Sequence, residues 1–208
     1  MSVLGVERSI NELKWTYKNT DDRLALAISQ RFDMPDIAAR ILAGRIQSIE
    51  EADAFLNPTL KNNLPNPFSL KDMEKAARRM AKAVMNHEPI GLMGDYDVDG
   101  ATSTALLKMF LESLGVTVFA YIPDREDGYG PSAKKMHEYH QKGCSVVATL
   151  DCGMTAFDPI QEGTDLGLDV IVLDHHDADE KRYPNAYAIV NPKRLDEDVN
   201  HPCHFMAA

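Results

Sequence analysis

The spacing of apolar residues changes near residue 88, and this change predicts two kinds of structure. Before it, apolar positions recur every three or four residues, which is typical of amphipathic helices. After it, short apolar runs alternate with helical patterns, which is typical of strands joined by helices. We expect helices over 23–31, 35–43, 49–56, 72–86, 102–114, 132–142 and 156–166, and strands over 90–93, 116–122, 145–150, 169–173 and 186–190.

Strands that alternate with helices through short links predict a parallel sheet with right-handed crossovers. The predicted fold class is therefore α/β, with a Rossmann-like parallel-sheet domain at residues 69–208. We expect a small helical region and a linker at residues 1–68, because three prolines interrupt the pattern between residues 57 and 67.

Polar side chains follow three of the expected strands at the point where each strand ends. The carboxyl ends of parallel strands meet at one edge of a sheet, where ligands bind. Five carboxylates brought together there repel one another unless a cation lies between them. We therefore predict a metal site at this edge. Its candidate residues are Asp95, Asp97, Asp99, Asp151, Asp174, His175 and His176.

The ligand types of this cluster favour Mn²⁺ or Mg²⁺, because oxygen ligands with an imidazole suit these cations better than a thiolate zinc site would. Two such ions can activate a water and stabilise the leaving oxygen in phosphoester hydrolysis. Asp151 follows a different strand from Asp95 and is the candidate bridge between two ions. Asp174 can orient a ring of the adjacent histidine pair.

Two other interpretations of these residues compete with a metal centre. The run Asp95–Gly100 matches the start of an EF-hand loop, but the twelfth position is Leu106 instead of glutamate and the preceding segment is strand-like. A lone Asp-Gly turn or His pair is usually a solvated loop. Three such clusters, each behind a strand of one α/β unit, make coincidence a poor explanation.

Several further residues are candidates for contacts with a phosphate or a base. Thr102 and Ser103 precede an expected helix, where backbone N–H groups bind phosphate; equally, they simply cap that helix. Tyr129 lies in a glycine-rich loop and can stack a base, although such a segment alone is an ordinary loop. Arg125 and Arg194 are phosphate-contact candidates, against the simpler interpretation of solvated surface.

Composition narrows the class of protein. The chain has 208 residues, 44% of them hydrophobic and 26% charged, as in ordinary globular proteins. We expect no membrane-spanning helix and no signal peptide, because no long apolar run occurs. Three widely spaced cysteines without a CxxC pair indicate a reducing, cytoplasmic setting. The net charge of −10 argues against a broad phosphate-binding surface, so a nucleic-acid partner would need a local basic patch.

The motifs themselves resemble a known family. Residues 94–103, GDYDVDGATS, resemble motif I of the DHH phosphoesterases, Asp151-Cys152-Gly153 resembles motif II, and Asp174-His175-His176 is the motif that gives the family its name. Residues 126–130 and 189–192 resemble the RecJ branch, the single-strand-specific 5′→3′ DNA exonucleases. The resemblance covers roughly residues 60–208.

This resemblance implies a role for each candidate. Asp97, Asp99 and Asp151 resemble Mn²⁺ ligands with Asp151 bridging, and Asp95 would support the first ion. His175 resembles the histidine ligand of the second ion, and His176 the histidine that contacts the scissile phosphate, with Asp174 beside it. Together with the residues considered above, the candidate substrate- or phosphate-binding residues are Thr102, Ser103, Arg125, Tyr129, Asn191 and Arg194.

The implied function is exonucleolytic hydrolysis of single-stranded DNA, in DNA repair and recombination, with two Mn²⁺ or Mg²⁺ ions and no membrane partner. The chain departs from the family in lacking its fourth motif and its DHHA1 and OB domains, so it looks like the N-terminal part of a longer protein. One alternative is therefore a non-catalytic or inactive truncated module, with apolar surface left exposed on its sheet. Another is a phosphodiesterase of short oligonucleotides or cyclic dinucleotides.

Overall fold

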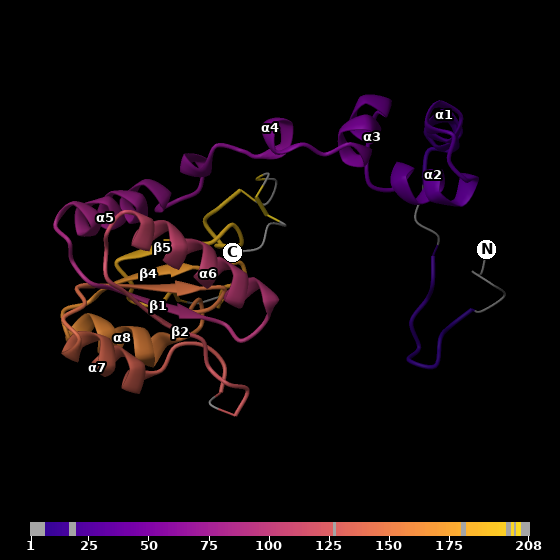
Figure 1. The fold of residues 1–208 in the computed structure, drawn as a ribbon. Helices are drawn as coiled ribbons and strands as arrows, with labels where there is room; N and C mark the ends of the chain where they lie inside the picture. Colours follow the sequence, from indigo (N-terminus) through magenta and orange to yellow (C-terminus); the bar gives the residue numbers. More distant parts are fainter. Residues whose placement is uncertain are drawn as a thin grey trace. The chain divides into compact units, whose positions relative to one another are not determined.

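The computed structural model describes residues 7–16, 20–126, 128–179, 182–198, 201 and 203–204. The chain divides into two compact units, Met1–Leu64 and Pro65–Ala208. The domain boundary expected after residue 68 stays a prediction. The elements (Figure 1) are α1 (Asp22–Phe32), α2 (Asp36–Ala43), α3 (Ile49–Leu56), α4 (Leu60–Asn63), η1 (Pro67–Ser69), α5 (Met73–Met85), β1 (Ile90–Gly94), α6 (Val98–Ser113), β2 (Val118–Tyr121), α7 (Ala133–Gln141), β3 (Val146–Leu150), α8 (Phe157–Asp165), β4 (Asp169–Leu173) and β5 (Ala188–Val190).

The first unit is a small helical cluster whose helices begin at polar caps. Asp21 accepts hydrogen bonds from the N–H groups of Arg23 and Leu24 and so starts α1. Ser48 accepts from the N–H of Glu51 at 3.2 Å, which confirms the cap predicted for α3. The buried core of this unit is small and consists of Ala25, Ile28, Ala39, Leu42, Ala43 and Ala52.

The proline-rich stretch at residues 57–67 is more ordered than predicted. We expected a loop, but the stretch contains α4 and the start of η1. Asn66 accepts a hydrogen bond from the N–H of Phe68, and Pro67 occupies the first position of η1, where its missing N–H costs nothing. Pro67 therefore begins a short helical turn.

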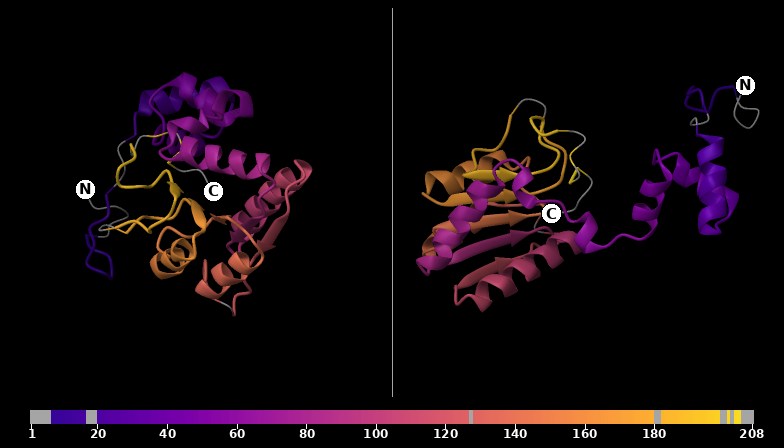
Figure 2. Two further views of the ribbon diagram at one scale, coloured as in Figure 1. Left: turned by 90° about the vertical axis from the view of Figure 1, so that its left-hand side faces the viewer. Right: turned by 90° about the horizontal axis from the view of Figure 1, so that it is seen from above.

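The second unit is built on a five-stranded parallel sheet with the order β2-β1-β3-β4-β5, which confirms the predicted α/β class. Its arrowheads all point the same way in Figure 2. Helices α5 and α6 cover one face, and α7 and α8 cover the other (Figure 1). Because both faces are covered, the central strands β1 and β3 are buried along their whole length.

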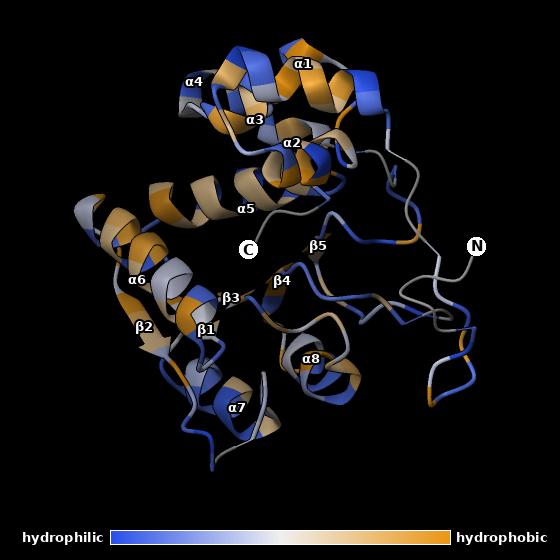
Figure 3. Cartoon of the chain, turned by 90° about the vertical axis from the view of Figure 1, so that its right-hand side faces the viewer, coloured by the Kyte–Doolittle hydropathy of each residue, from blue (hydrophilic) through white to orange (hydrophobic). Residues whose placement is uncertain are grey.

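Alternate residues of each strand enter two separate cores. On β3, Val146, Ala148 and Leu150 pack in the core on the side of α5 and α6. Val147 packs on the other side with residues of α7 and α8. Figure 3 shows apolar residues recurring along the helices that flank the sheet. Within the described residues, no helix is both long and apolar enough to span a membrane.

Helix α6 begins four residues earlier than predicted. We expected residue 102 as its start, whereas α6 runs from Val98. The reason is Asp97, whose carboxylate accepts the Gly100 N–H at 3.0 Å and caps the helix. The last two aspartates of the cluster are therefore the cap and the first turn of α6.

A buried arginine ties α5 to the amino-terminal edge of the sheet. The side chain of Arg79 is 8% exposed and contacts the carboxylates of Glu88 at 2.8 Å and Asp169 at 2.6 Å. Ser145 also donates to Glu88. Hydrogen bonds from Ser145, Asn86 and Arg79 lower the pKa of Glu88 to about 2. The ionised form of Glu88 is therefore part of the folded structure.

We expect Glu88→Gln to destabilise the second unit by ~1–3 kcal/mol at pH 7, the usual cost of a lost hydrogen bond to a charged group. Because the pKa of Glu88 is lowered in the folded state, its contribution is present above the unfolded pKa and is lost as pH falls toward 2. The difference between wild type and variant in urea unfolding should shrink below pH 4.

Glu74→Gln is the matched control on α5, because its pair with Arg78 is exposed on both sides and such pairs contribute under ~1 kcal/mol. An equal loss of stability in the two variants would contradict the structural role given to Glu88.

Candidate metal centre

Three aspartates stand at equivalent positions just beyond three neighbouring strands. Asp95 follows β1, Asp151 follows β3 and Asp174 follows β4, and the strand register aligns Gly94 with Leu150 and Leu150 with Leu173. The N–H of each aspartate donates to the last carbonyl of the next strand, at 2.9–3.1 Å. The sheet ladder thus continues one residue further and holds these three buried side chains at one edge.

The carboxylates and imidazoles at this edge form two groups that can each hold an ion. One group is Asp95, Asp97 and Asp151, and the other is Asp151, His175 and His176; within each, one ligand atom per residue lies within 4.8 Å of the others. Asp151 belongs to both. The geometry therefore brings together every predicted ligand except Asp99. Because Asp151 belongs to both groups, it stays the candidate to bridge two ions.

Asp151 is the least satisfied residue of the site. Its side chain is fully buried, and neither carboxylate oxygen has a hydrogen-bond partner among the described residues. Its backbone has a φ of 60°, a conformation that is costly for a residue other than glycine and is concentrated at functional sites. Burial raises the pKa of Asp151 to about 7, followed by a hydrogen bond from its protonated form to Asp97 and by the negative charge of that carboxylate. A buried carboxylate that accepts no hydrogen bond requires a proton or a cation.

The distance between two ligand atoms fits a cation. Nε2 of His175 lies 2.9 Å from Oδ1 of Asp151, without the geometry of a hydrogen bond. Ligands at ~2.1 Å on adjacent corners of an octahedron lie ~3 Å apart, which is the arrangement that Mg²⁺ and similar ions require. The orphaned oxygens, the oxygen-rich ligand set and this spacing all fit a divalent cation at Asp151.

Asp97 and Asp99 occupy different positions than expected. Asp97 faces the cluster and also caps α6; the hydrogen bond from the Gly100 N–H is the main cause that lowers its pKa. Asp99 lies in the first turn of α6 and is in neither group of described ligands, whereas Asp95 is. The role of Asp99 as a ligand stays a prediction, and the geometry favours Asp95.

Asp174 fixes the orientation of the histidine pair. Its Oδ1 accepts from the N–H groups of His175 and His176 and lies 2.8 Å from Nδ1 of His176, while Oδ2 accepts the Met154 N–H. Burial of His176 would lower its pKa, but the hydrogen bond to Asp174 raises it above the usual range. With Nδ1 held by Asp174, His176 points Nε2 away from that carboxylate. The sequence did not predict the hydrogen bond from Met154 to Asp174, because a backbone N–H donates it.

An aromatic row extends from His176. The hydroxyl of Tyr129 lies 3.3 Å from Nδ1 of His176, and the two rings meet edge to face at 5.9 Å. Tyr96 meets Tyr129 at 6.4 Å, and the guanidinium of Arg125 covers the Tyr96 ring at 4.7 Å. Tyr129 and Arg125 therefore belong to one series of ring contacts that begins at His176. Their role as substrate contacts stays a prediction. Tyr96 was not among the candidates.

Asn191 and Arg194 are engaged in supporting contacts. Asn191 is buried, donates to the backbone carbonyl of His176 at 2.9 Å and accepts from the Lys193 N–H. Arg194 contacts Asp72, at the start of α5, at 2.9 Å, and also pairs with Asp196. These contacts position the histidine loop and β5. The expected role of both residues in substrate binding stays a prediction.

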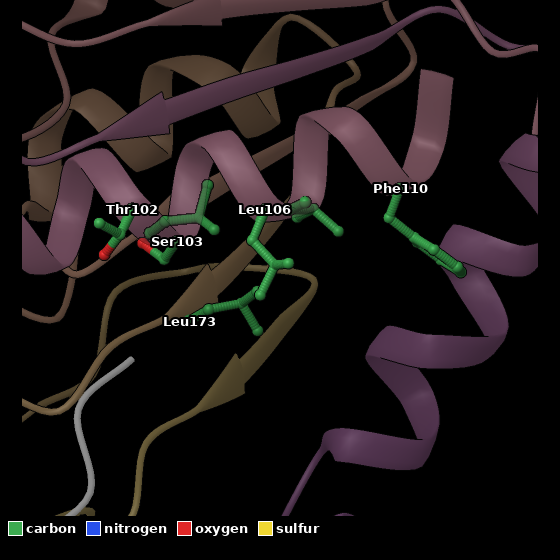
Figure 4. A pocket seen from close by; sticks show the side chains of 7 residues that line it. Thr102, Ser103, Leu106, Phe110 and Leu173 are labelled. Atoms are coloured by element: carbon green, nitrogen blue, oxygen red, sulfur yellow. The ribbon is translucent and has the colours of Figure 1, made fainter. Parts of the chain in front are cut away.

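Thr102 and Ser103 lie in the second turn of α6. Their hydroxyls donate to the carbonyls of Val98 and Asp99, as helical Ser and Thr commonly do. Because the helix begins earlier, their N–H groups are no longer at its free end. Both side chains line an apolar cavity of about 570 Å³ with Leu106, Phe110 and Leu173 (Figure 4). The exposed apolar side chains at this cavity, Leu106 and Phe110, belong to α6, whereas Leu150 of the sheet is buried. The expected exposure of apolar surface on the sheet stays a prediction.

Fold and site together define a parallel α/β domain with two overlapping groups of residues, each able to hold a cation, at the carboxyl edge of its sheet. Residues 89–205 match the DHH family, N-terminal domain, and the chain belongs to this family. The resemblance inferred from the motifs is confirmed.

Similar proteins agree with this assignment. The single-stranded-DNA-specific exonuclease RecJ of Bacillus subtilis is 33% identical over 88% of this chain, and that of Escherichia coli is 35% identical over 84%. The chain spans 23% and 30% of these relatives, respectively.

Two solved structures share the fold. The crystal structure of exonuclease RecJ bound to manganese has 35% identity and a TM-score of 0.56, over 62% of this chain and 33% of that one. RecJ from Thermus thermophilus in complex with Mn²⁺ has 25% identity and a TM-score of 0.60, over 85% of this chain and 24% of that one.

We expect the metal-free protein to lose stability as pH rises from about 4 to 7, because of Asp151. Its raised folded pKa means that the folded state holds a proton that the unfolded state has released in this window. Asp151→Asn should remove this decline, as measured by urea unfolding in EDTA at a series of pH values. Asp158→Asn, an exposed aspartate on α8, should keep it. If the stability of Asp151→Asn and of wild type depended on pH with the same slope, the raised pKa of Asp151 would be contradicted.

Proposed function

We propose that this chain carries the metal-binding part of a site that hydrolyses phosphodiester bonds of single-stranded DNA with two Mn²⁺ or Mg²⁺ ions. The observation that carries the proposal is Asp151, a buried carboxylate with two unsatisfied oxygens shared by two ligand groups. The names of the relatives supply the substrate, and two RecJ structures contain Mn²⁺.

In this proposal, one set of side chains binds the cations and another contacts the phosphate. Asp95, Asp97 and Asp151 supply oxygen ligands on one side, and His175 adds an imidazole on the other. When bound, the two cations supply a more acidic water and stabilise negative charge on the leaving oxygen. The buried carboxylates place this chemistry at the edge of a rigid sheet, which favours precise positioning.

His176 acts on the substrate in this proposal. Asp174 holds its Nδ1, so the opposite nitrogen, Nε2, is the one available to a phosphate oxygen. The raised pKa of His176 favours the protonated ring, which donates a charge-assisted hydrogen bond to the phosphate. Asn191 fixes the backbone of the same residue from behind.

The proposal predicts release of nucleotides from single-stranded DNA that requires Mn²⁺ and is abolished by Asp151→Ala. The resemblance implies 5′→3′ polarity, which 5′- and 3′-labelled strands distinguish. Mn²⁺ should also raise the thermal midpoint of wild type and leave that of Asp151→Ala unchanged. A Mn²⁺-induced thermal shift without hydrolysis of DNA, dinucleotides or cyclic dinucleotides would support the non-catalytic alternative, and selective hydrolysis of the short substrates would support the phosphodiesterase alternative.

A second variant tests the contribution of His176 to hydrolysis separately from metal binding. We expect His176→Ala to lower the rate of hydrolysis by about 10²–10⁴-fold, the usual contribution of a positioned proton donor. The Mn²⁺-induced thermal shift should persist, because three carboxylates and His175 remain. His137→Ala, an exposed histidine that contacts Glu162, is the matched control and should keep the wild-type rate. An active His176→Ala variant would remove His176 from the mechanism.

A further inference from the structure

The two outer strands of the sheet differ in how their outer edges are covered. β5 forms one edge of the sheet and β2 the other (Figure 1). The backbone groups of Ile189, in β5, point away from β4, and both have partners. Asp72 accepts the N–H at 3.1 Å, and Arg194 donates to the carbonyl at 2.7 Å. An edge blocked in this way cannot add a further strand.

The outer edge of β2 has no such block among the described residues. Ile90 donates its N–H to the carbonyl of Thr117 at 3.0 Å, so the backbone groups of residues 117, 119 and 121 point toward β1. Successive residues of a strand direct these groups to alternate sides, so those of Val118 and Ala120 point away from the sheet. No backbone group outside the sheet bonds to these two residues within the described part of the chain.

The side chains beside this edge carry positive charge on one face of the sheet. Toward α7, the ammonium group of Lys135 lies over the ring of Tyr121 at 4.0 Å, and that of Lys142 lies over Phe119 at 4.8 Å. Toward α6, Ala120 is exposed and uncharged. Ammonium groups therefore accompany alternate positions of β2, on the α7 face only.

A third lysine adds to this charge. Helix α7 and the residue after it carry Lys134, Lys135 and Lys142 against a single carboxylate, Glu138. The hydrogen bond from Lys135, and then the charges of the three lysines, lower the pKa of Glu138. Because Lys135 pairs with Glu138 at 2.6 Å, Lys134 and Lys142 are the exposed cations that remain.

The neighbouring segments do not extend the positive charge. On α6, Lys108 is paired with Glu112 at 2.5 Å. Residues 124–127, which follow β2, carry three carboxylates against Arg125. The excess of positive charge is therefore confined to the α7 face of the strand itself.

A second copy of the chain fits this edge poorly. Antiparallel pairing of two β2 strands would place Lys135 and Lys142 of both copies on one face, where like charges repel. Lysines beside an edge strand are a common means of preventing such pairing. The same lysines attract a strand that carries carboxylates, so they select an acidic partner.

The spacing of the lysines defines this partner more closely. They contact residues 119 and 121, and side chains two positions apart lie on one face of a strand, roughly 7 Å from each other. A strand added to this edge meets both lysines only if its own carboxylates also alternate along the chain.

We propose that the outer edge of β2 binds an extended acidic segment of a partner protein as an additional strand of the sheet. The backbone of this segment pairs with Val118 and Ala120, and its glutamates or aspartates, at alternate positions, face Lys135 and Lys142. This interaction surface is independent of the metal centre and of hydrolysis.

The probe is a dye-labelled peptide of eight residues in which glutamate alternates with valine, and fluorescence anisotropy reports its binding to the full chain. We expect binding that weakens as salt is added. A peptide of the same composition with consecutive glutamates should bind at least ~5-fold more weakly, as expected for loss of one or two exposed ion pairs. A peptide with lysines in place of the glutamates should not bind.

Methylation of the peptide amides tests strand addition without changing the protein. In an added strand, the N–H groups of either the glutamates or the valines face β2, and those of the other set face away. Methylation of one set should weaken binding at least ~10-fold, because backbone hydrogen bonds are lost, and methylation of the other set should have a much smaller effect. Equal effects of the two sets would overturn strand addition.

Variants of the protein test the same contacts from the other side. Ala120→Pro removes an outward N–H and should weaken binding at least ~10-fold, whereas Ala120→Ser keeps it and should bind as wild type. Lys142→Glu should weaken binding ~5-fold, and Lys82→Glu, at an exposed lysine of α5, should not. An unchanged thermal midpoint and Mn²⁺-induced thermal shift verify that each variant is folded.

Three further results would overturn the proposal. The first is failure of wild type to bind the alternating peptide. The second is a dimer in sedimentation that Ala120→Pro dissociates, which would assign the edge to a second copy. The third is displacement of the peptide by single-stranded DNA whose binding needs Lys142 but tolerates Ala120→Pro, which would assign the lysines to nucleic acid. None of these measurements requires hydrolysis, so failure of the proposed function leaves the test intact.

Discussion

Negative charge confined at the carboxyl edge of the sheet is the constraint on which the rest of the structure depends. Asp95, Asp151 and Asp174 are buried within one layer, and their backbone N–H groups are locked into the ladder of neighbouring strands, so they cannot move apart. The three carboxylates differ in the hydrogen bonds that compensate their negative charge. Asp174 accepts four close contacts from N–H groups and a ring, and Asp95 accepts the Tyr96 N–H. Neither oxygen of Asp151 has a hydrogen-bond partner among the described residues, and this difference supports its proposed place at the centre of a cation site.

The surrounding contacts hold the same edge from outside. Asn191 connects β5 to the carbonyl of His176, and Arg194 connects the following turn to Asp72 at the start of α5. Asp72 also accepts the N–H of Ile189 within β5. A helix that precedes the sheet is thus tied to its last strand and, through Asn191, to the histidine loop. Such supporting contacts keep ligands within the narrow geometry that metal-assisted chemistry requires.

The sequence predicted the regular elements of the second unit well, since buried parallel strands and amphipathic helices leave strong periodic signals. It failed where one residue has two roles: Asp97 is both a ligand candidate and the cap of α6, so the helix start was placed too late. It also could not reveal partners distant in the chain. Arg194 meets Asp72 across 122 positions, and Tyr96 becomes notable only because Arg125 folds over it. A sequence motif shows which side chains are present, whereas only the tertiary structure shows which of them already contact another residue.

The proposed function requires an acidic chain to act on a polyanion. A net charge of −10 argues against a broad basic surface, and the arginines of the second unit discussed above contact carboxylates or a tyrosine ring. In the proposed function, two divalent cations at Asp151 and the protonated ring of His176 would compensate the negative charge of the phosphate. Positive charge concentrated at this one edge of the sheet makes phosphate binding compatible with a strongly acidic surface.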